Sequence, residues 1–294
     1  MQMTKIDIYL DEIPKMAAYK SKLSQNLYKG LKLFSKNFRI INEPEKAQLI
    51  FTINMDFFIQ KYENDFNNNK KKIILISAKD TILDCANIIF SNKDKYVLNY
   101  LEFLVNTNIY NNKILCILNM SKYFRNYQNE VKQLKDRFYD VVFIGNLKYD
   151  DKQIEKKRIE ILEKIKEIGE KNKLSFYSCG SIKIEEYYGI LRETKLFISP
   201  YGYGEWSLKD YECILFGCQV VKPNIYYKCH PNFYENMEHY NDDINNFEKT
   251  ILNLLENICI QQKKVDINRQ MFLQYNLEED IKILENEIIK NLSI

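Results

Sequence analysis

Short apolar runs alternate with amphipathic stretches along most of the chain, and this alternation predicts an α/β fold. The clearest example lies near residue 200. An apolar run at Leu196–Ser199 predicts a buried strand, and a second run predicts another strand at Gln219–Lys222. The stretch from Leu208 to Leu215 between them has the broad apolar face of a helix. Strand, helix and strand in this order are typical of a parallel βαβ unit.

The same pattern occurs upstream, where strands are predicted at residues 140–147 and 174–180, with helices at residues 151–171 and 185–193. Each of the three strands runs into a glycine: Gly145, Gly180 and Gly202. Adjacent parallel strands share one crevice at their carboxyl ends. We therefore expect these three glycines to border a common ligand site.

The first part of the chain also alternates between strand-like and helical patterns. A helix is predicted at residues 14–34, and a second parallel sheet is predicted from strands at residues 6–10, 38–41, 49–54, 73–77 and 113–120. The predicted fold class is therefore α/β, with two Rossmann-like domains. We place an N-terminal domain at 1–130, a C-terminal domain at 131–275, and a last helix at 276–294 that packs back on the first domain.

The turn after Ser199 carries most of the unusual polar chemistry. Gly202 and Gly204 allow backbone amides to approach a ligand closely. Ser207 stands three residues before Asp210, the spacing of a capping box, so a helix should begin there. A helix start that follows a parallel strand points its free amides at the crevice, where anions bind. Lys209 adds a positive charge, so the segment predicts a phosphate or nucleotide site.

This segment resembles the donor-binding core of GT-B glycosyltransferases, and in particular bacterial sugar transferases related to the exostosin group. The resemblance covers about residues 138–235, and it implies two Rossmann-like domains with a cleft between them. The matching positions are Pro200, Gly202, Gly204, Glu205, Ser207, Lys209, Tyr211, Glu212, Gly217, Val220, Val221 and Pro223.

Roles for individual residues follow from the resemblance. It implies that Lys209 meets the donor pyrophosphate, where the group usually has Arg, and that Glu212 holds the ribose of the nucleotide sugar. It implies no cofactor and no bound metal, because positive side chains and a helix dipole stabilise the leaving group. The expected donor-binding residues are Gly145, Asn146, Gly180, Tyr201, Gly202, Gly204, Glu205, Ser207, Lys209, Glu212 and His230.

A general base is needed to take the proton of the acceptor hydroxyl. The catalytic candidates are Asp11 and Asp56, each just past a predicted strand, and Glu205 in the glycine loop. For Asp11 and Asp56 the competing interpretation is a solvated turn or cap carboxylate. His230 is either a donor contact or a loop histidine with a structural hydrogen bond, and His239 is expected on an exposed helix.

Composition narrows the class of partner. The formal net charge of +3 is too small a bias to argue for nucleic acid. The seven cysteines are scattered and favour reduced residues of a cytoplasmic protein. We expect no leader, and no apolar run in the sequence is long enough to cross a bilayer. Lys22, Lys29 and Lys36 share one helix face, which is either solvated or a contact for an anionic membrane or lipid-linked acceptor. Arg158 and Arg192 are expected in surface ion pairs, with donor phosphates as the alternative.

The functional hypothesis is a metal-independent glycosyltransferase that moves a sugar from a nucleotide-sugar donor to a hydroxyl of a surface glycan or glycolipid. It would act in the cytoplasm, at the inner face of the membrane if the acceptor is lipid-linked. Two alternatives stay open. One is transfer of another group from a nucleotide diphosphate donor, such as a CDP-polyol. The other is a non-catalytic nucleotide-binding partner subunit.

Overall fold

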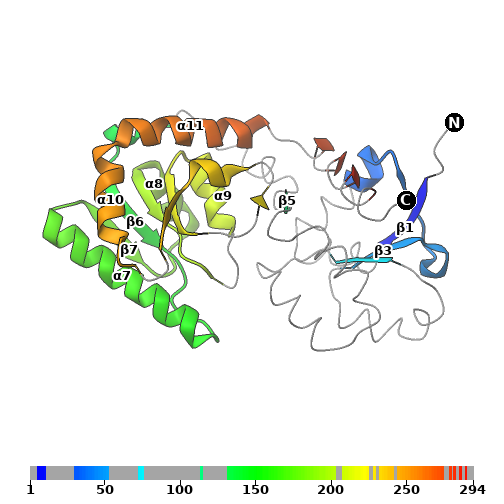
Figure 1. Ribbon diagram of the computed structural model, residues 1–294, viewed down its shortest axis with the longest axis horizontal. Coiled ribbons are helices and arrows are strands. Elements are labelled where there is room, and N and C mark those ends of the chain that lie inside the picture. The colour runs from blue at the N-terminus through cyan, green and yellow to red at the C-terminus, as the bar shows by residue number, and fades with distance from the viewer. Residues whose placement is uncertain are drawn as a thin grey trace. The chain divides into compact units, whose positions relative to one another are not determined.

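The chain divides into two compact units, which Figure 1 shows in a computed structural model. One unit comprises Met1–Asn119 together with Tyr275–Ile294, and the other comprises Met120–Gln274. The structure describes residues 5–10, 30–52, 72–75, 113–114, 131–202, 207–224, 228–229, 232–241 and 244–274, and helical positions 278, 279, 281, 282, 285, 286 and 289. Both units contain a parallel sheet, which confirms the predicted α/β class.

The first unit is built on a four-stranded sheet in the order β2-β1-β3-β4, and every adjacent pair is parallel. Strand β1, one of the two inner strands, has alternating burial: Ile6, Ile8 and Leu10 are buried, and the residues between them are half-buried. The bounds are β1 Ile6–Leu10, β2 Phe38–Ile40, β3 Leu49–Thr52 and β4 Lys72–Leu75, with a 3-10 turn η1 at Pro44–Lys46 and a short strand β5 at Lys113–Ile114.

The C-terminal segment belongs to this first unit through Glu285, whose side chain is 2% exposed. Its carboxylate accepts hydrogen bonds from the Ser35 hydroxyl and from the backbone N–H of Asn37, at 3.2 Å in the second case. The Asn37 side-chain amide also donates to it, at 3.1 Å. Ser35 and Asn37 lie just before β2, so one buried carboxylate fixes the residues that lead into that strand.

The second unit contains a five-stranded sheet in the order β11-β9-β8-β6-β7, and all adjacent pairs are parallel. The strands with the predicted terminal glycines therefore lie side by side, as β8, β6 and β7. The bounds are β6 Tyr139–Ile144, β7 Phe176–Cys179, β8 Thr194–Ile198, β9 Gln219–Pro223 and β11 Glu238–Tyr240, and the two-residue strand β10 is Lys228–Cys229.

Among the described residues of this unit, five helices and two 3-10 turns accompany the sheet. The bounds are α7 Lys152–Asn172, α8 Ile184–Arg192, α9 Leu208–Leu215, α10 Phe247–Glu256, α11 Ile258–Gln274, η3 Leu134–Asp136 and η4 Phe233–Asn236. The connection from β6 to β7 and the connection from β8 to β9 run in opposite directions across the sheet. Right-handed crossovers consequently place α7 and α9 on opposite faces. The strand order thus has its topological switch point between β6 and β8.

The core on the α7 face joins that helix and α10 to the sheet, and the two helices lie together in Figure 1. Ile161, Ile165 and Ile168 of α7 are buried at helical spacing, which is the amphipathic pattern expected of a helix lying on a sheet. The cluster is completed by Val141, Phe143, Leu196, Ile198, Val221, Tyr240, Phe247, Ile251 and Leu254.

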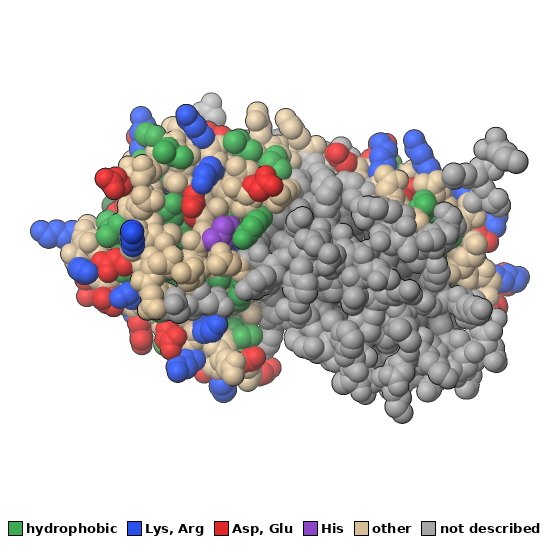
Figure 2. Space-filling model, in the orientation of Figure 1, with side chains coloured by type: hydrophobic (Ala, Val, Ile, Leu, Met, Phe, Trp, Pro, Cys, Tyr) green, Lys and Arg blue, Asp and Glu red, His purple; other side chains and the backbone are tan. Residues whose placement is uncertain are grey.

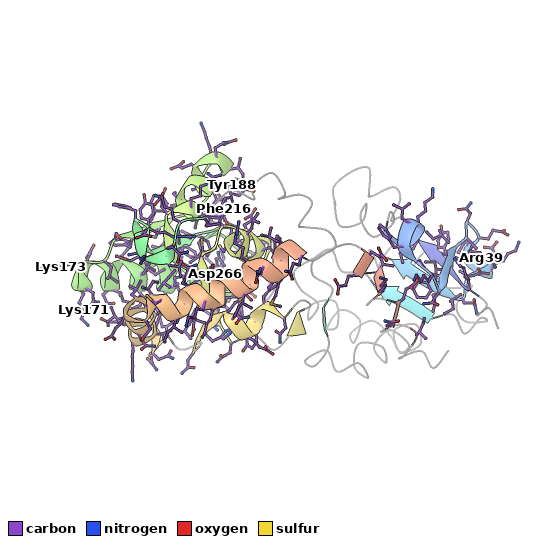
Figure 3. All side chains as sticks on the ribbon, turned by 90° about the horizontal axis from the view of Figure 1, so that it is seen from above. Arg39, Lys171, Lys173, Tyr188, Phe216 and Asp266 are labelled. Carbon is purple, nitrogen blue, oxygen red and sulfur yellow. The ribbon has the colours of Figure 1, made fainter. Side chains whose placement is uncertain are left out.

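A glycine follows the end of helix α9 and caps it. Gly217 has a φ of 69°, its N–H donates to the carbonyl of Ile214 at 3.0 Å, and the N–H of Cys218 donates to the carbonyl of Cys213 at 2.8 Å. These two bonds form a Schellman motif. Helix α7 ends with Lys173 in the same left-handed region, at a φ of 55°. Lys171 and Lys173 mark this end of α7 in Figure 3.

On the face shown in Figure 2, lysine, arginine and acidic side chains are interspersed over the described surface of the second unit. None of the described helices combines the length and apolar character required to cross a membrane.

Candidate functional site

The candidate site lies where β6 and β8 end and α9 begins, at the topological switch point of the second sheet. Lys209, in the first turn of α9, reaches across to the end of β6 and donates from its Nζ to the carbonyl of Ile144 at 2.7 Å. The side chain is half-buried, and burial together with the charge of Arg158 lowers the pKa of Lys209. Within the described part of the chain, no carboxylate forms an ion pair with its ammonium group.

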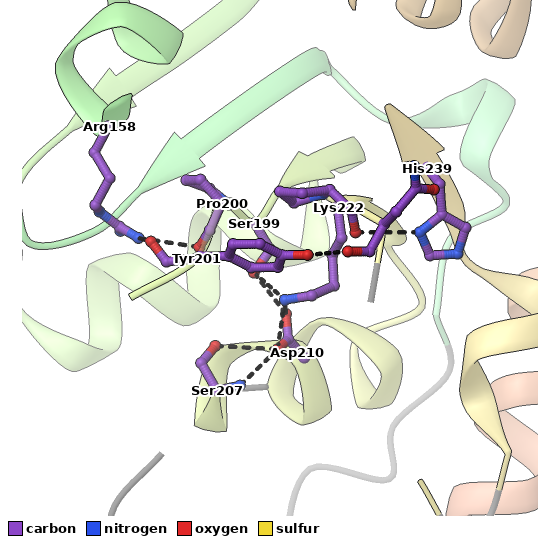
Figure 4. A network of polar contacts seen from close by, with 10 residues as sticks. Arg158, Ser199, Pro200, Tyr201, Ser207, Asp210, Lys222 and His239 are labelled. Atoms are coloured by element: carbon purple, nitrogen blue, oxygen red, sulfur yellow. Dashed lines mark hydrogen bonds and ion pairs between the residues drawn. The ribbon is translucent and has the colours of Figure 1, made fainter. Parts of the chain in front are cut away.

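Arg158 of α7 is a second cation at these strand ends, and it is 6% exposed. Its Nε donates to the carbonyl of Asn146 at 2.8 Å, while one Nη donates to the carbonyls of Pro200 at 3.0 Å and Tyr201 at 2.8 Å. The guanidinium therefore links the turn after β6 to the turn after β8. Figure 4 shows its hydrogen bonds to the turn after β8.

Gly145 makes this arrangement possible. A Cβ at this position would lie 2.3 Å from the Nη2 of Arg158 and 3.3 Å from the Nζ of Lys209. The first distance is shorter than any real contact, so a side chain here would displace the guanidinium. The sequence predicts that Gly145 borders a ligand. In the structure, the absence of a side chain at Gly145 leaves room for the side chains of Arg158 and Lys209.

Glu212 lies one turn after Lys209, on the same side of α9, and is 5% exposed. The hydroxyl of Tyr188, from α8, donates to its carboxylate at 3.3 Å. Burial raises the pKa of Glu212. The neighbouring Tyr187 hydroxyl is also buried and finds no hydrogen-bond partner among the described residues. A carboxylate can accept about four hydrogen bonds, so Glu212 keeps capacity for ligand hydroxyls.

Aromatic packing holds the tyrosine that contacts Glu212. The ring centroid of Tyr188 lies 5.0 Å from that of Phe216, just past the end of α9, and the two residues lie close together in Figure 3. Tyr188 of helix α8 thereby contacts α9 twice, through its hydroxyl at Glu212 within the helix and through its ring at Phe216 just past the end.

The third polar residue in the first turns of α9, Asp210, faces the sheet and is fully buried. Its carboxylate accepts from the Ser199 hydroxyl at 2.6 Å and from the Ser207 N–H at 2.7 Å, which is the predicted capping contact. It also pairs with the Nζ of Lys222, on β9, at 2.9 Å. Figure 4 shows this network, which joins β8, α9 and β9.

The other predicted donor residues take several positions. Gly180 follows β7 and has open space on its Cβ side, whereas a Cβ on Gly202 would meet the Tyr149 hydroxyl at 3.2 Å. Asn146 is exposed, and its side chain bonds within its own turn, to the backbone of Lys148. Tyr201 donates from its hydroxyl to the carbonyl of Asn224, beyond β9.

Several predicted residues lie outside the described part of the chain. They are Asp11 and Asp56, the candidate bases of the first domain, and Gly204, Glu205 and His230 of the second. The lysines Lys22 and Lys29 lie outside it as well. Their roles remain predictions.

Two expectations about basic and imidazole side chains are wrong. Arg158 is a buried ligand of backbone carbonyls rather than a member of a surface ion pair. His239 is half-buried on strand β11, where its ring nitrogens lie 3.4 Å from the carbonyls of Pro223 and Tyr234. Burial lowers the pKa of His239. The burial of Arg158 and His239 could not be predicted from their polar sequence neighbours, because it comes from the tertiary fold.

A cavity of about 170 Å³ lies on the α7 side of the turn after β8. Its lining includes Ile154, Arg158, Tyr201, Gly202 and Tyr240. Neither Lys209 nor Glu212 reaches it, and its volume is below the roughly 300–1,000 Å³ typical of small-molecule pockets. We therefore assign the candidate site to the side of Lys209 and Glu212. Within the described residues, no group of three His, Cys, Asp or Glu side chains could hold a metal ion.

Comparison with known proteins gives weak likenesses. Neither the models of protein families nor the curated proteins match this sequence. Among solved structures, the chain is similar to TarM, with 15% identity and a TM-score of 0.44 over 92% of this chain and 58% of that one. It is also similar to the pneumococcal O-GlcNAc transferase GtfA in complex with UDP and GlcNAc, with 9% identity and a TM-score of 0.47 over 92% of this chain and 60% of that one.

A third similar structure is the sucrose-phosphate synthase of Thermosynechococcus elongatus, with 12% identity and a TM-score of 0.46 over 98% of this chain and 99% of that one. The chain spans less than two thirds of the length of TarM and of GtfA. These likenesses are too low to assign a function, which has to rest on the residues of the site.

Proposed function

We propose that this protein is a GT-B-type glycosyltransferase, which moves a sugar from a nucleotide-sugar donor to an acceptor hydroxyl. In this proposal the donor binds to the domain at 131–275, at the ends of β6 and β8. The acceptor is a surface glycan or a lipid-linked glycan, and the reaction takes place in the cytoplasm, at the inner face of the membrane for a lipid-linked acceptor.

The observation that carries this proposal is the position of Lys209. A half-buried ammonium group lies at the start of α9 and at the end of β6, with a backbone carbonyl as its described partner and no carboxylate. A bound diphosphate would supply the missing negative charge. The positive end of the helix dipole favours an anion at the same place. Arg158 adds positive potential next to Gly145.

Glu212 is proposed to receive the ribose of the donor. Its carboxylate is buried, has one described donor in Tyr188, and lies one helical turn from Lys209. The spacing of the two residues matches the order of diphosphate and ribose in a nucleotide. Two vicinal hydroxyls would donate to the carboxylate in its ionised form, which would offset the cost of burying it.

Catalysis would then depend on charge stabilisation of the leaving group. When the bond from the anomeric carbon to the diphosphate oxygen breaks, negative charge grows on that oxygen. Lys209 and the helix start would stabilise this charge without a metal ion. Asp11, Asp56 and Glu205 remain the proposed bases for the acceptor proton, and the Asn or Gln variant of the true base should lose transfer but keep donor binding.

The test is release of free nucleotide from the sugar conjugates of UDP, GDP, CDP and ADP and from a CDP-polyol, each with and without EDTA. A metal-independent transferase should hydrolyse one donor slowly in both conditions, and Lys209→Ala should lower the rate by about a hundredfold. Release from a CDP-polyol alone would favour the other transferase. Binding without any release would favour a non-catalytic nucleotide-binding subunit.

A further inference from the structure

We propose that the buried ion pair between Asp210 and Lys222 is a positioning device for the donor site, which aims Lys209 and Glu212 from the first turns of α9. This inference rests on the proposed function, because it assigns a purpose to the geometry of that site. Asp210 and Lys222 themselves touch no donor in this proposal.

The pair is almost completely withdrawn from water. The side chain of Lys222 is 1% exposed and that of Asp210 is 0% exposed, and Lys222 Nζ lies 2.9 Å and 3.1 Å from the two carboxylate oxygens. Removing two charges from water is costly, so a buried pair is weak grounds for stability and better explained by what it specifies.

What this pair specifies is the direction in which α9 begins. Ser199 follows β8, Ser207 precedes α9, and Lys222 belongs to β9; all three bond to the single carboxylate of Asp210. The first turn of the helix is thereby fixed to two strands at once. An apolar side chain at 210 could pack against the sheet, but it would not fix the helix against sliding or rotation.

Fixing Asp210 also fixes Lys209 and Glu212, whose side chains leave α9 in other directions. Lys209 reaches the end of β6, and Glu212 reaches Tyr188 on α8. Successive residues in a helix differ by about 100° in direction, so a rotation of α9 would move both groups together. Displacement by about 1 Å of a group that binds substrate can cost as much as a hundredfold in rate.

The chain contains a matched pair for comparison. Asp140 and Lys195 form an ion pair at 2.6 Å between β6 and β8, and their side chains are 19% exposed. The pair lies near the amino ends of these two strands, whereas the candidate site lies at their carboxyl ends. This pair has the same chemistry and lies in the same sheet, but none of its contacts with described residues reaches the candidate site.

The experiment compares the full-length double variant Asp210→Asn/Lys222→Met with Asp140→Asn/Lys195→Met. Both charges are removed together, since removing one alone would leave the other buried and unpaired. The probe is whichever of UDP, GDP, CDP or ADP binds the wild type most tightly. We expect at least about a tenfold rise in Kd for the first variant, with a cooperative melt retained, and less than about a twofold change for the second.

A second measurement reports the position of Lys209 without any ligand. The lysines are methylated with ¹³C, the Lys209 resonance is assigned with Lys209→Arg, and its pKa is followed by NMR. In the wild type this pKa is lowered by burial, and it should rise towards the ordinary value only in Asp210→Asn/Lys222→Met. If that variant does not fold, Ser199→Ala removes one bond to Asp210 and should shift Kd and pKa in the same directions.

Unchanged probe affinity and an unchanged Lys209 pKa in a folded variant would overturn the positioning role, as would equal losses in the two double variants. Failure of the wild type to bind any of the four diphosphates would instead contradict the proposed function. In that case the NMR titration alone decides whether the ion pair places Lys209.

Discussion

At the scale of single residues, three successive polar positions of α9 do three different things. Lys209 faces the end of β6, Asp210 faces the sheet, and Glu212 faces α8. The sequence motif shows that these residues stand at a helix start, but it does not show which one is buried in an ion pair. A motif names the residues, and the fold separates the two groups proposed to meet the donor from the one buried in an ion pair.

Replacing Glu212 by Gln should separate stability from binding. Burial raises the pKa of this carboxyl above its value in the unfolded chain, so its contribution to stability is present at low pH and is lost as pH rises through that raised value. Glu212→Gln should therefore unfold at a higher temperature than the wild type at pH 8, and this gain should disappear near pH 4.5, the ordinary value for a glutamate. Differential scanning calorimetry across this range measures it.

The same variant should bind the donor nucleotide at least about tenfold more weakly, because a neutral amide is a poorer acceptor for ribose hydroxyls. A residue that stabilises the protein when removed, but is needed for binding, is typical of a functional site. Wild-type affinity in Glu212→Gln would show that the carboxylate does not hold the ribose.

Gly145 offers a steric test at the residue scale. Gly145→Ala should displace the Arg158 guanidinium, lower the free energy of unfolding by about 1–3 kcal/mol, and weaken diphosphate binding. Gly189→Ala, in α8, is the matched control, because a Cβ there meets nothing within 4 Å. Chemical denaturation of both variants compares them; equal stability would mean that Arg158 is not fixed where the structure has it.

At the scale of elements, the ends of two helices give opposite predictions. Lys173 caps α7 with a φ of 55°, and Gly217 caps α9 with a φ of 69°. Lys173→Gly should stabilise the protein by about 1 kcal/mol, because glycine has no Cβ penalty in this region. Gly217→Ala should destabilise it by about 1–2 kcal/mol or more, since the new Cβ would also lie 2.9 Å from Arg137. Urea unfolding of the two variants measures both signs; a loss of stability in Lys173→Gly would contradict the cap assignment.

Elements whose apolar residues follow a clear period could be predicted from the sequence, and this includes β6, β8, α7 and α9. Helix α10 was missed, although Phe247, Ile251 and Leu254 are buried at helical spacing and could have indicated it. Helix α11 could not be recognised by its pattern. It buries Gln261 and Asn268 and exposes Ile260 and Ile267, so its amphipathic signal is almost absent.

The candidate site was predictable only in part, for a related reason. Lys209 and Glu212 belong to a local motif, whereas Arg158, Tyr188 and Lys222 come from other elements and meet the site through the fold. Nothing in the sequence around Lys222 marks it as buried. The neighbouring Val220 and Val221 favour an ordinary strand there, and the acidic partner lies on the preceding helix.

At the scale of the whole molecule, the last residues of the chain belong to the first unit. Glu285 accepts hydrogen bonds from Ser35 and Asn37, ahead of β2. Ending the chain after Gln274 should therefore expose these groups and destabilise the unit that contains Met1–Asn119, while the unit Met120–Gln274 keeps its own core. We expect hydrogen exchange to accelerate in β1 and β2 and to stay slow in β6 and β8. Equal acceleration in both sheets would contradict this division.

The central claim is that the positive site at the start of α9 binds a nucleoside diphosphate. Titration calorimetry of UDP, GDP, CDP and ADP into the wild type and into Lys209→Met tests it most directly. We predict that at least one diphosphate binds the wild type, that EDTA leaves this unchanged, and that Lys209→Met raises its Kd about tenfold or more. No binding by any of the four, or equal affinity in Lys209→Met, would contradict the account.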